Sequence, residues 1–165
     1  MSAPDLLGFS GDWATYVEVI YERYCDDLVR NERELWGRPV STRYNPATNG
    51  KHFSFWHVIS EGKVEVDRLP DLQRCSRIGW IAWVIESCHQ SAAGFSWWIS
   101  ERTTSRGRKK NLVLWAEADD FVVVVEPRQE YVLLVSAYPV QGRRAARLAI
   151  ERDEYWNGQL MAPLW

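Results

Sequence analysis

The sequence contains little cysteine: Cys25, Cys75 and Cys88 are the only three in 165 residues. Three widely spaced cysteines do not form the disulfide framework of a small secreted domain, and the odd count indicates reduced thiols. No run of about 18 apolar residues, as a spanning helix requires, is present. The N-terminus lacks the basic region and apolar stretch of a signal peptide. We therefore expect a cytoplasmic protein without a membrane partner.

Motifs for common cofactors and for metal ions are also missing. The chain contains no GxGxxG, GxxxxGK[ST] or GxSxG sequence, which argues against nucleotide-dependent and serine-hydrolase chemistry. Cys88 and His89 are adjacent, but no CxxC or HxxxH pattern accompanies them. We therefore expect no cofactor and no metal site.

Length and composition indicate one globular domain spanning residues 1–165. Hydrophobic residues make up 46% of the chain and charged residues 25%, both close to the averages for globular proteins. The net charge of −2 argues against a protein that coats nucleic acid through a generally basic surface. Any nucleic-acid site must therefore be local.

Apolar residues recur at helical spacing between Trp13 and Leu28. Asp12, just before them, is a residue type that caps exposed backbone N–H groups. This pattern predicts a helix that begins near Asp12 and ends before Asn31. The segment 36–50 carries two prolines and an Asn-Gly pair, so we expect a connector of extended chain and turns there.

Two further apolar segments belong to the N-terminal, mainly helical part of the chain, at about 11–90. Residues 53–59 are rich in aromatic and β-branched side chains, which favours a strand but leaves room for a helical turn. Pro70 and Asp71 suit the start of a helix. Residues 78–86 fit both helical spacing and strand alternation, so the sequence leaves helix and strand open for them.

The apolar period changes to two after Phe95. Strand candidates are 96–101, 112–117, 121–126 and 131–138, and the apolar runs within the last two indicate central strands covered on both faces, on one side by the N-terminal helices. A final helix is expected at about 142–155. We therefore predict an α+β fold, with N-terminal helices packed on a four-stranded antiparallel β-meander (about 95–138), followed by a C-terminal helix.

A basic segment separates the first two predicted strands. Residues 101–110 contain Arg102 and four further cations that are candidates for binding nucleic acid: Arg106, Arg108, Lys109 and Lys110. A guanidinium group can form a bidentate contact with two phosphate oxygens, so a local cluster of this kind suits a polyanion. The alternative is a hairpin tip whose charges are simply solvated.

His57 and the end of the last predicted strand are the best candidates for chemistry. His57 lies close in sequence to Glu61, and imidazole titrates near neutrality, as proton transfer in RNA cleavage requires. Strand alternation places Ser136 and Tyr138 on one face, where both hydroxyls can meet one substrate. The alternatives are a structural histidine and a tyrosine packed on the final helix.

The chain resembles a family of uncharacterised proteins of bacterial phages and mobile elements. The resemblance covers about residues 16–155. It rests on Phe55-Trp56-His57, Ser60-Glu61-Gly62, Arg68-Leu69-Pro70-Asp71-Leu72, Arg74-Cys75, Arg77-Ile78, Trp80, Leu112-Val113-Leu114-Trp115, Glu126-Pro127-Arg128, Tyr131 and Ser136-Ala137-Tyr138. The layout of helices before a four-stranded sheet also resembles the superfamily of small RNases and toxins that includes barnase, EndoU, colicin nucleases and RelE.

This second resemblance implies a toxin-type endoribonuclease that cleaves tRNA or mRNA without a metal ion, through a 2′,3′-cyclic phosphate. It implies that His57 acts as general base or acid and that Ser136 holds the scissile phosphate. Arg77, Arg102 or Arg128 would stabilise the phosphorane, and Glu61 and Tyr138 are possible proton-transfer partners. An inhibitory antitoxin or immunity protein is the partner that such a toxin implies.

Two other classes of function remain open from the sequence. The ten tryptophans are compatible with a non-enzymatic interaction module, such as a phage-borne inhibitor or an antitoxin-like protein. A nucleic-acid-binding module that stacks bases on aromatic side chains beside the basic segment is the third possibility.

Overall fold

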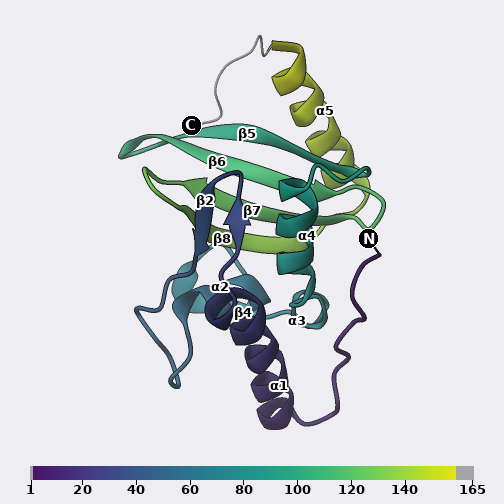
Figure 1. Ribbon diagram of the computed structural model, residues 1–165. Coiled ribbons are helices and arrows are strands. Elements are labelled where there is room, and N and C mark those ends of the chain that lie inside the picture. Colours follow the sequence, from purple (N-terminus) through teal and green to yellow (C-terminus); the bar gives the residue numbers. More distant parts are fainter. Residues whose placement is uncertain (1, 159–165) are drawn as a thin grey trace.

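The computed structural model of the chain describes residues 2–158. It has an α+β fold built on one curled sheet of six strands, with helices on both faces (Figure 1). The strands are β1 (Glu34–Leu35), β2 (Arg38–Ser41), β5 (Phe95–Thr104), β6 (Gly107–Ala116), β7 (Phe121–Pro127) and β8 (Val132–Pro139). Their order across the sheet is β1-β2-β8-β7-β6-β5.

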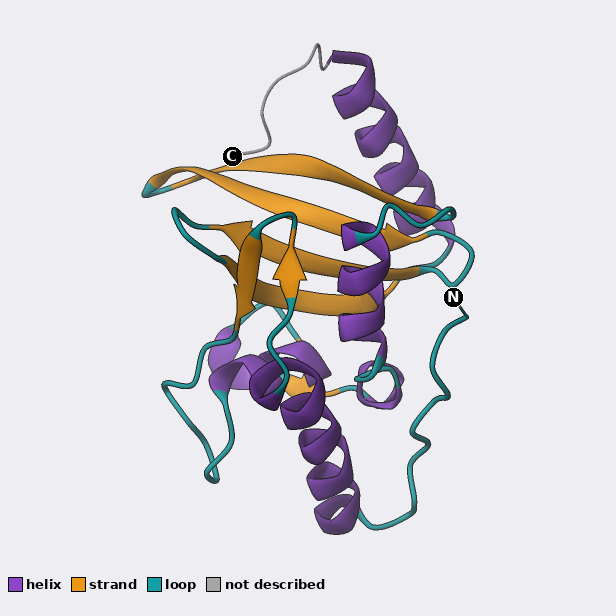
Figure 2. Cartoon of the chain, in the orientation of Figure 1, coloured by secondary structure: helices purple, strands orange, loops and turns teal. Residues whose placement is uncertain are grey.

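Helices and a small second sheet complete the described chain (Figure 2). The helices are α1 (Trp13–Cys25), a π-helical turn (Asp26–Arg30), α2 (Phe53–Ile59), a 3₁₀ turn (Glu65–Asp67), α3 (Leu72–Ser76), α4 (Trp80–His89) and α5 (Gly142–Gly158). Strands β3 (Ser60–Glu61) and β4 (Leu69–Pro70) pair antiparallel and form the β3–β4 hairpin, residues 60–70. The predicted C-terminal helix is confirmed as α5.

The prediction of a four-stranded antiparallel meander was wrong in its extent. The strands β5 to β8 do pair antiparallel in chain order, but the sheet continues past β8. There β2 pairs parallel to β8, with Val40 opposite Val132, and β1 pairs antiparallel to β2. These strands have two and four residues. Strand β2 lies in the segment 36–50 that was expected to be a connector, and β1 lies just before it. Pro39 and the short lengths leave no alternating pattern to detect.

Two hydrophobic cores lie on opposite faces of the sheet. The larger core joins α1, α2, α3 and α4 to one face, and includes Ile20, Phe55 and Ile85 from the helices and Leu114 and Val123 from the sheet. The smaller core lies under α5, where Leu148 packs with Trp98, Trp115 and Val122. Every residue from Phe121 to Val125 is buried, which confirms that β7 is a central strand covered on both faces.

Two segments that the sequence left open are helical, 53–59 throughout and 78–86 from Trp80 onward. The strand favoured for 53–59 is α2, whose buried residues Ser54, Phe55, Val58 and Ile59 recur after four positions. Helix α2 packs between the other helices and β8, and this tertiary packing overrides the β propensity of the residues in α2. Residues 80–85 of α4 are all buried. A helix that is apolar on all sides has no amphipathic stripe. The spacing of apolar residues in this segment therefore fits a strand as well as a helix.

The first helix has the predicted start. The carboxylate of Asp12 accepts a hydrogen bond from the Thr15 backbone N–H at 3.1 Å and caps α1. Helical structure continues through the π-helical turn to Arg30, as expected. Rings of Tyr21 and Tyr24 pack against Phe55, with centroids 4.8 and 5.5 Å away, so α1 is held on α2 on the side away from the sheet (Figure 1).

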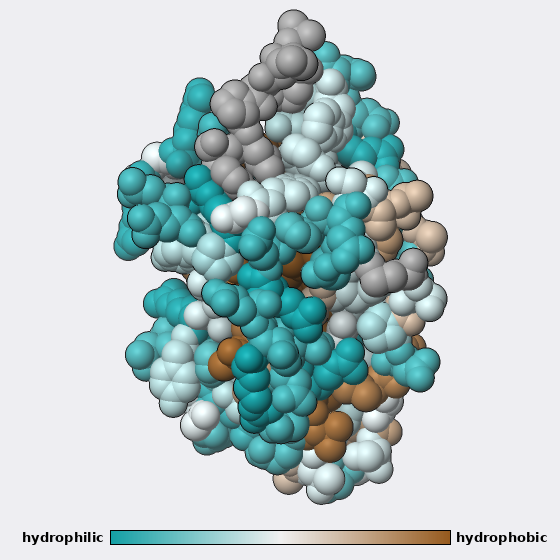
Figure 3. Space-filling view, in the orientation of Figure 1, coloured by the Kyte–Doolittle hydropathy of each residue, from teal (hydrophilic) through white to brown (hydrophobic). Residues whose placement is uncertain are grey.

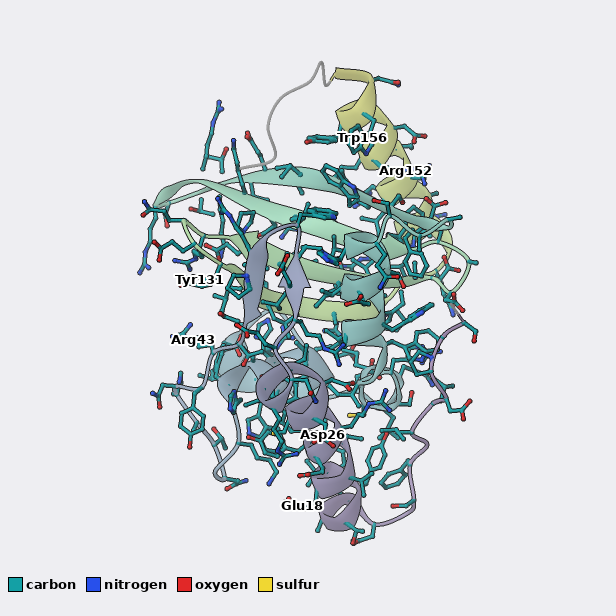
Figure 4. The ribbon with its side chains drawn as sticks, viewed as in Figure 1. Glu18, Asp26, Arg43, Tyr131, Arg152 and Trp156 are labelled. Carbon is teal, nitrogen blue, oxygen red and sulfur yellow. The ribbon has the colours of Figure 1, made fainter. Side chains whose placement is uncertain are left out.

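Helix α5 is fixed to the edge strand β5. Figure 4 shows Arg152 and Trp156 on α5 beside that strand. The indole N–H of Trp156 donates a hydrogen bond to the Trp97 carbonyl at 2.7 Å. The guanidinium of Arg152 donates one to the Glu117 carboxylate, also at 2.7 Å. The far end of α5 is thereby anchored, and its first turns lie over the part of the sheet that contains β8.

The surface in Figure 3 is mainly hydrophilic, with apolar patches toward the side where α1 and the N-terminal segment lie. The exposed large apolar residues of this region include Leu6, Phe9 and Val19. Among residues 2–158, no helix has both the length and the apolar composition needed to cross a bilayer.

Candidate active site

The candidate site forms where β8 lacks a strand neighbour. Strand β2 pairs with β8 only at Val132 and Leu133, and in the described chain no other strand takes up that edge beyond Leu133. Helices α2 and α3 pack against β8 instead, and the β3–β4 hairpin between them reaches the face of the sheet that carries α5. The result is a cleft between this hairpin, the uncovered part of the sheet and the first turns of α5.

The cleft has a volume of about 670 Å³. From the sheet it is lined by Arg102, Asn111, Val124, Val135, Ser136 and Tyr138. From α2, the β3–β4 hairpin and α3 it is lined by His57, Glu61, Gly62, Lys63, Arg68 and Arg74, and Arg144 of α5 completes it. Five of the seven residues predicted to be catalytic therefore line one cleft: His57, Glu61, Arg102, Ser136 and Tyr138.

A β-bulge in β8 shapes this wall of the cleft. Val124 pairs with Ser136 whereas Val125 pairs with Leu134, so Val135 is an extra residue in the ladder. The bulge allows the consecutive residues Val135 and Ser136 both to line the cleft, with Tyr138 beyond them. Bulges of this kind often redirect side chains beside functional sites.

His57 is oriented by a carboxylate from the 3₁₀ turn. Its Nδ1 lies 3.1 Å from Oε1 of Glu65, while its side chain is 21% exposed. The ring also packs beside Phe53, with centroids 5.7 Å apart. Because Glu65 occupies Nδ1, Nε2 is the ring nitrogen left to exchange a proton with a bound molecule. Proximity in sequence had indicated Glu61 as the partner, but the structure gives this contact to Glu65.

Arg68 holds the β3–β4 hairpin against the end of α2. Its guanidinium donates to the carbonyls of His57 at 2.9 Å and Gly62 at 2.8 Å, and also to that of Ser60. Gly62 has a φ of +139°, and a Cβ there would lie 3.3 Å from the Arg68 Cα, so glycine permits this close approach. The carbonyls at the end of α2 and in the hairpin are thereby fixed around the His57 side of the cleft.

Two guanidinium groups contact the ring of Tyr138. The Cζ atom of Arg144 is 4.4 Å from the centroid of its ring, and that of Arg74 is 5.5 Å away. Both distances are within the range of cation–π contact. Arg74 also donates to the Ser60 carbonyl at 2.9 Å. Burial, reinforced by the charge of Arg68, lowers the pKa of Arg74, and a bound anion would compensate this concentration of positive charge.

Two of the predicted catalytic arginines lie beside the cleft. Arg77 lines an adjoining hollow with Arg74 and Tyr138. Arg128 lines another hollow, which also reaches His57, and Arg128 is paired with Glu126 at 3.1 Å. Of the three candidates for a phosphate-stabilising cation, Arg102 alone lines the cleft itself.

The basic segment has a different form from the predicted loop. Strands β5 and β6 extend to Thr104 and from Gly107, so most of its cations lie on paired strands. Arg108 and Lys110 lie 3.9 and 3.5 Å from the carboxylate of Glu101, and Lys109 lies 3.2 Å from that of Glu126. These carboxylates partly neutralise the cluster. Arg106 occupies the turn and is exposed.

Sequence reasoning did not select several residues that line the cleft: Lys63, Arg68, Arg74, Asn111 and Arg144. Arg68 and Arg74 lie within the segments that carry the family resemblance, which was the one available signal. Asn111 Oδ1 is buried without a hydrogen-bond partner among residues 2–158. Its place in the cleft depends on the pairing of β6 with β5 and is not visible in local sequence.

Comparison of the chain with models of protein families, with curated proteins and with solved structures gives no match. The relation to RNases therefore stays a prediction. Among residues 2–158, no group of three or more His, Cys, Asp and Glu side chains is positioned to hold a metal ion.

Proposed function

We propose that the protein is a metal-independent endoribonuclease that cleaves RNA through a 2′,3′-cyclic phosphate. The observation that carries the proposal is the cleft shared by His57, Ser136 and Arg102, which belong to α2, β8 and β5. A proton-transfer group, a hydroxyl and a cation in one cleft are the groups that RNA transesterification needs.

In this reaction the 2′-oxygen of the substrate loses its proton and attacks the adjacent phosphorus, and the bond from phosphorus to the 5′-oxygen breaks. The products are a 2′,3′-cyclic phosphate and a 5′-hydroxyl, which receives a proton. His57 exchanges one of these protons through Nε2, with Glu65 orienting the ring from Nδ1. Glu61 and Tyr138 are the candidates for the second proton transfer, because both line the same cleft.

Ser136 would hold the scissile phosphate through its hydroxyl. Arg102 would stabilise the charge of the phosphorane, with Arg144 and Arg74 close by against the Tyr138 ring. Arg102 and Arg144 form no ion pair with a carboxylate of residues 2–158. Their charge therefore remains available to a phosphate, and bidentate guanidinium contacts suit its oxygens.

The test is incubation of the purified protein with total RNA in EDTA, followed by analysis of fragment ends. The wild-type protein should leave cyclic phosphates and 5′-hydroxyls. His57→Ala and Ser136→Ala should lower the rate, with a loss of about 10²–10⁴-fold for the proton-transfer residue. Intact RNA with the wild-type protein, or equal rates for wild type and His57→Ala, would exclude this mechanism.

Comparing variants of two arginines identifies the cation that stabilises the phosphorane. Arg102→Gln removes a charge from the cleft, whereas Arg128→Gln removes one that is already paired with Glu126. We expect the Arg102 variant to lose the larger part of the activity. The reverse order would assign phosphate stabilisation to the hollow beside Arg128.

An inhibitory protein partner is a separate part of the proposal. The β3–β4 hairpin beside the cleft exposes Val66 to 89% and Leu69 to 70%. Apolar side chains this exposed favour burial against another protein, and the same hairpin contributes Glu61, Gly62 and Lys63 to the cleft. Co-expression of a neighbouring gene product that restores growth would support a toxin with an inhibitor, and Val66→Ser should weaken that complex.

A further inference from the structure

Three adjoining hollows form one continuous surface around Tyr138 and Arg144. Both residues line the cleft of about 670 Å³, a second hollow of about 510 Å³ and a third of about 390 Å³. The second hollow extends toward α3, and the third follows the first turns of α5. We refer to this surface as the arginine groove. Besides Arg68, which holds the β3–β4 hairpin, its arginines are Arg74, Arg77, Arg102, Arg143, Arg144 and Arg147.

Charge in the arginine groove is one-sided. The carboxylates that line the same three hollows are Glu61, Asp71 and Glu151, in a chain whose net charge is −2. Glu151 already accepts a hydrogen bond from Ser100 at 2.7 Å. On α5, Arg152 pairs with Glu117 and Asp153. The three arginines that precede it, Arg143, Arg144 and Arg147, form no ion pair with Glu151 or with any other carboxylate of residues 2–158. The groove is therefore a local cationic surface on an acidic protein.

The position of these arginines is unfavourable for the helix itself. Arg143 and Arg144 lie in the first turn of α5, and Arg147 in the next, with no acidic residue in that first turn. The N-terminal end of a helix dipole is positive, so acidic residues stabilise it and cations do not. An anion bound there would interact favourably with both the dipole and the three guanidinium groups.

Two apolar side chains, Val124 and Val135, line the cleft part of the groove. They accompany the Oδ1 of Asn111, which has no hydrogen-bond partner among residues 2–158. A single strand presents bases to an apolar floor and phosphates to a cationic wall, whereas a duplex turns its bases inward. The combination therefore fits single-stranded nucleic acid.

We infer that the arginine groove, and in particular Arg143 and Arg147 on α5, binds the phosphodiester backbone of the RNA strand on one side of the bond to be cleaved. This deepens the proposed function, on which it rests for the identity of the strand as substrate. It assigns backbone binding to α5 rather than to the β5–β6 hairpin, whose cations at positions 108–110 have carboxylates beside them.

The test uses an RNA that binds without being cut. A fluorescein-labelled 2′-O-methyl RNA of about 12 nucleotides lacks the attacking 2′-hydroxyl, and its affinity is measured by fluorescence anisotropy over a range of salt concentrations. Arg143→Gln/Arg147→Gln is compared with Arg106→Gln/Arg108→Gln, which removes the same charge from the hairpin. All four side chains are exposed, so both variants should fold, as circular dichroism and thermal melting will verify.

The α5 variant should weaken binding by at least about tenfold at moderate salt. It should also reduce the slope of log affinity against log salt by about 1.4, since each lost phosphate contact on a single strand changes it by about 0.7. The hairpin variant should show a smaller loss. Equal losses, a larger loss from the hairpin, or no binding by the wild type would each overturn the inference.

Failure of the two proposals can be told apart. Tight binding of the 2′-O-methyl strand that depends on Arg143 and Arg147, without cleavage of ordinary RNA, would refute the nuclease and leave the groove as a strand-binding site. Cleavage of RNA that is unaffected in both affinity and rate by the α5 substitutions would refute the groove and leave the nuclease. A duplex bound more tightly than the single strand would also refute the groove as described.

Discussion

Replacing Arg68 by methionine should loosen the β3–β4 hairpin. Three backbone carbonyls, of His57, Ser60 and Gly62, accept hydrogen bonds from this one guanidinium, and the side chain is only 14% exposed. Methionine keeps much of the apolar stem but provides no donor. The substitution therefore isolates the hydrogen bonds from the packing.

The expected loss follows from these contacts. A hydrogen bond to a charged group contributes about 1.5–3 kcal/mol. Arg74 still donates to the Ser60 carbonyl, and the other two carbonyls regain water when the hairpin opens, so we expect a total of about 3 kcal/mol. For a chain of this size, that corresponds to a fall in Tm of about 6–12 °C.

Lys63→Met is the matched control, because it removes a cation from an exposed position of the same hairpin. It should change the free energy of unfolding by less than about 0.5 kcal/mol. Urea unfolding gives both values, and hydrogen exchange of residues 60–70 shows whether the loss is local. If Arg68→Met is no less stable than Lys63→Met, the network around Arg68 does not fix the hairpin and the reasoning is wrong.

Three further predictions concern side chains on both sides of the sheet. Tyr138→Phe should unfold at nearly the wild-type urea concentration, whereas Tyr138→Leu should lose about 1–2 kcal/mol because it removes the ring that two guanidinium groups contact. Equal losses of stability in the two variants would mean that the hydroxyl, not the ring, stabilises the contact. Burial raises the pKa of Cys75 and of Cys88 to about 12, so neither thiol should react with a disulfide reagent at about pH 8 until the protein unfolds, and mass spectrometry of the labelled native protein checks this. Burial lowers the pKa of His52 below its ordinary 6.5, so the unfolded chain binds this proton more readily and stability falls as the pH drops through that value. His52→Gln should lose less stability than the wild type between about pH 7.5 and 5.5, and identical slopes in urea titrations would contradict this.

The sequence was informative where one local pattern dominates. The helical spacing from Trp13 and the capping Asp12 predict α1 because neither depends on distant residues. The alternation after Phe95 likewise predicts the antiparallel pairing of β5 to β8. By contrast, the pairing of Val40 with Val132 joins segments far apart in the chain, and a two-residue ladder leaves no periodic pattern in the sequence around Val40.

The candidate site shows the same division. His57, Ser136 and Tyr138 were selected from residue type and strand alternation, and they line one cleft. Glu65 was missed as the partner of His57 because the 3₁₀ turn brings it back toward α2, where sequence distance favoured Glu61. Arg144 was missed because its role depends on where α5 crosses the sheet, which no local pattern specifies.

The position of β8 after α2 in the chain has a consequence for when the cleft forms during synthesis. Residues that line the cleft begin at His57 and end at Arg144, and β8 supplies the wall with Ser136 and Tyr138. A nascent chain that ends before β8 therefore contains the histidine but not the hydroxyls facing it. The cleft can therefore form only after β8 and the start of α5 have left the ribosome, and products truncated before β8 should be inert.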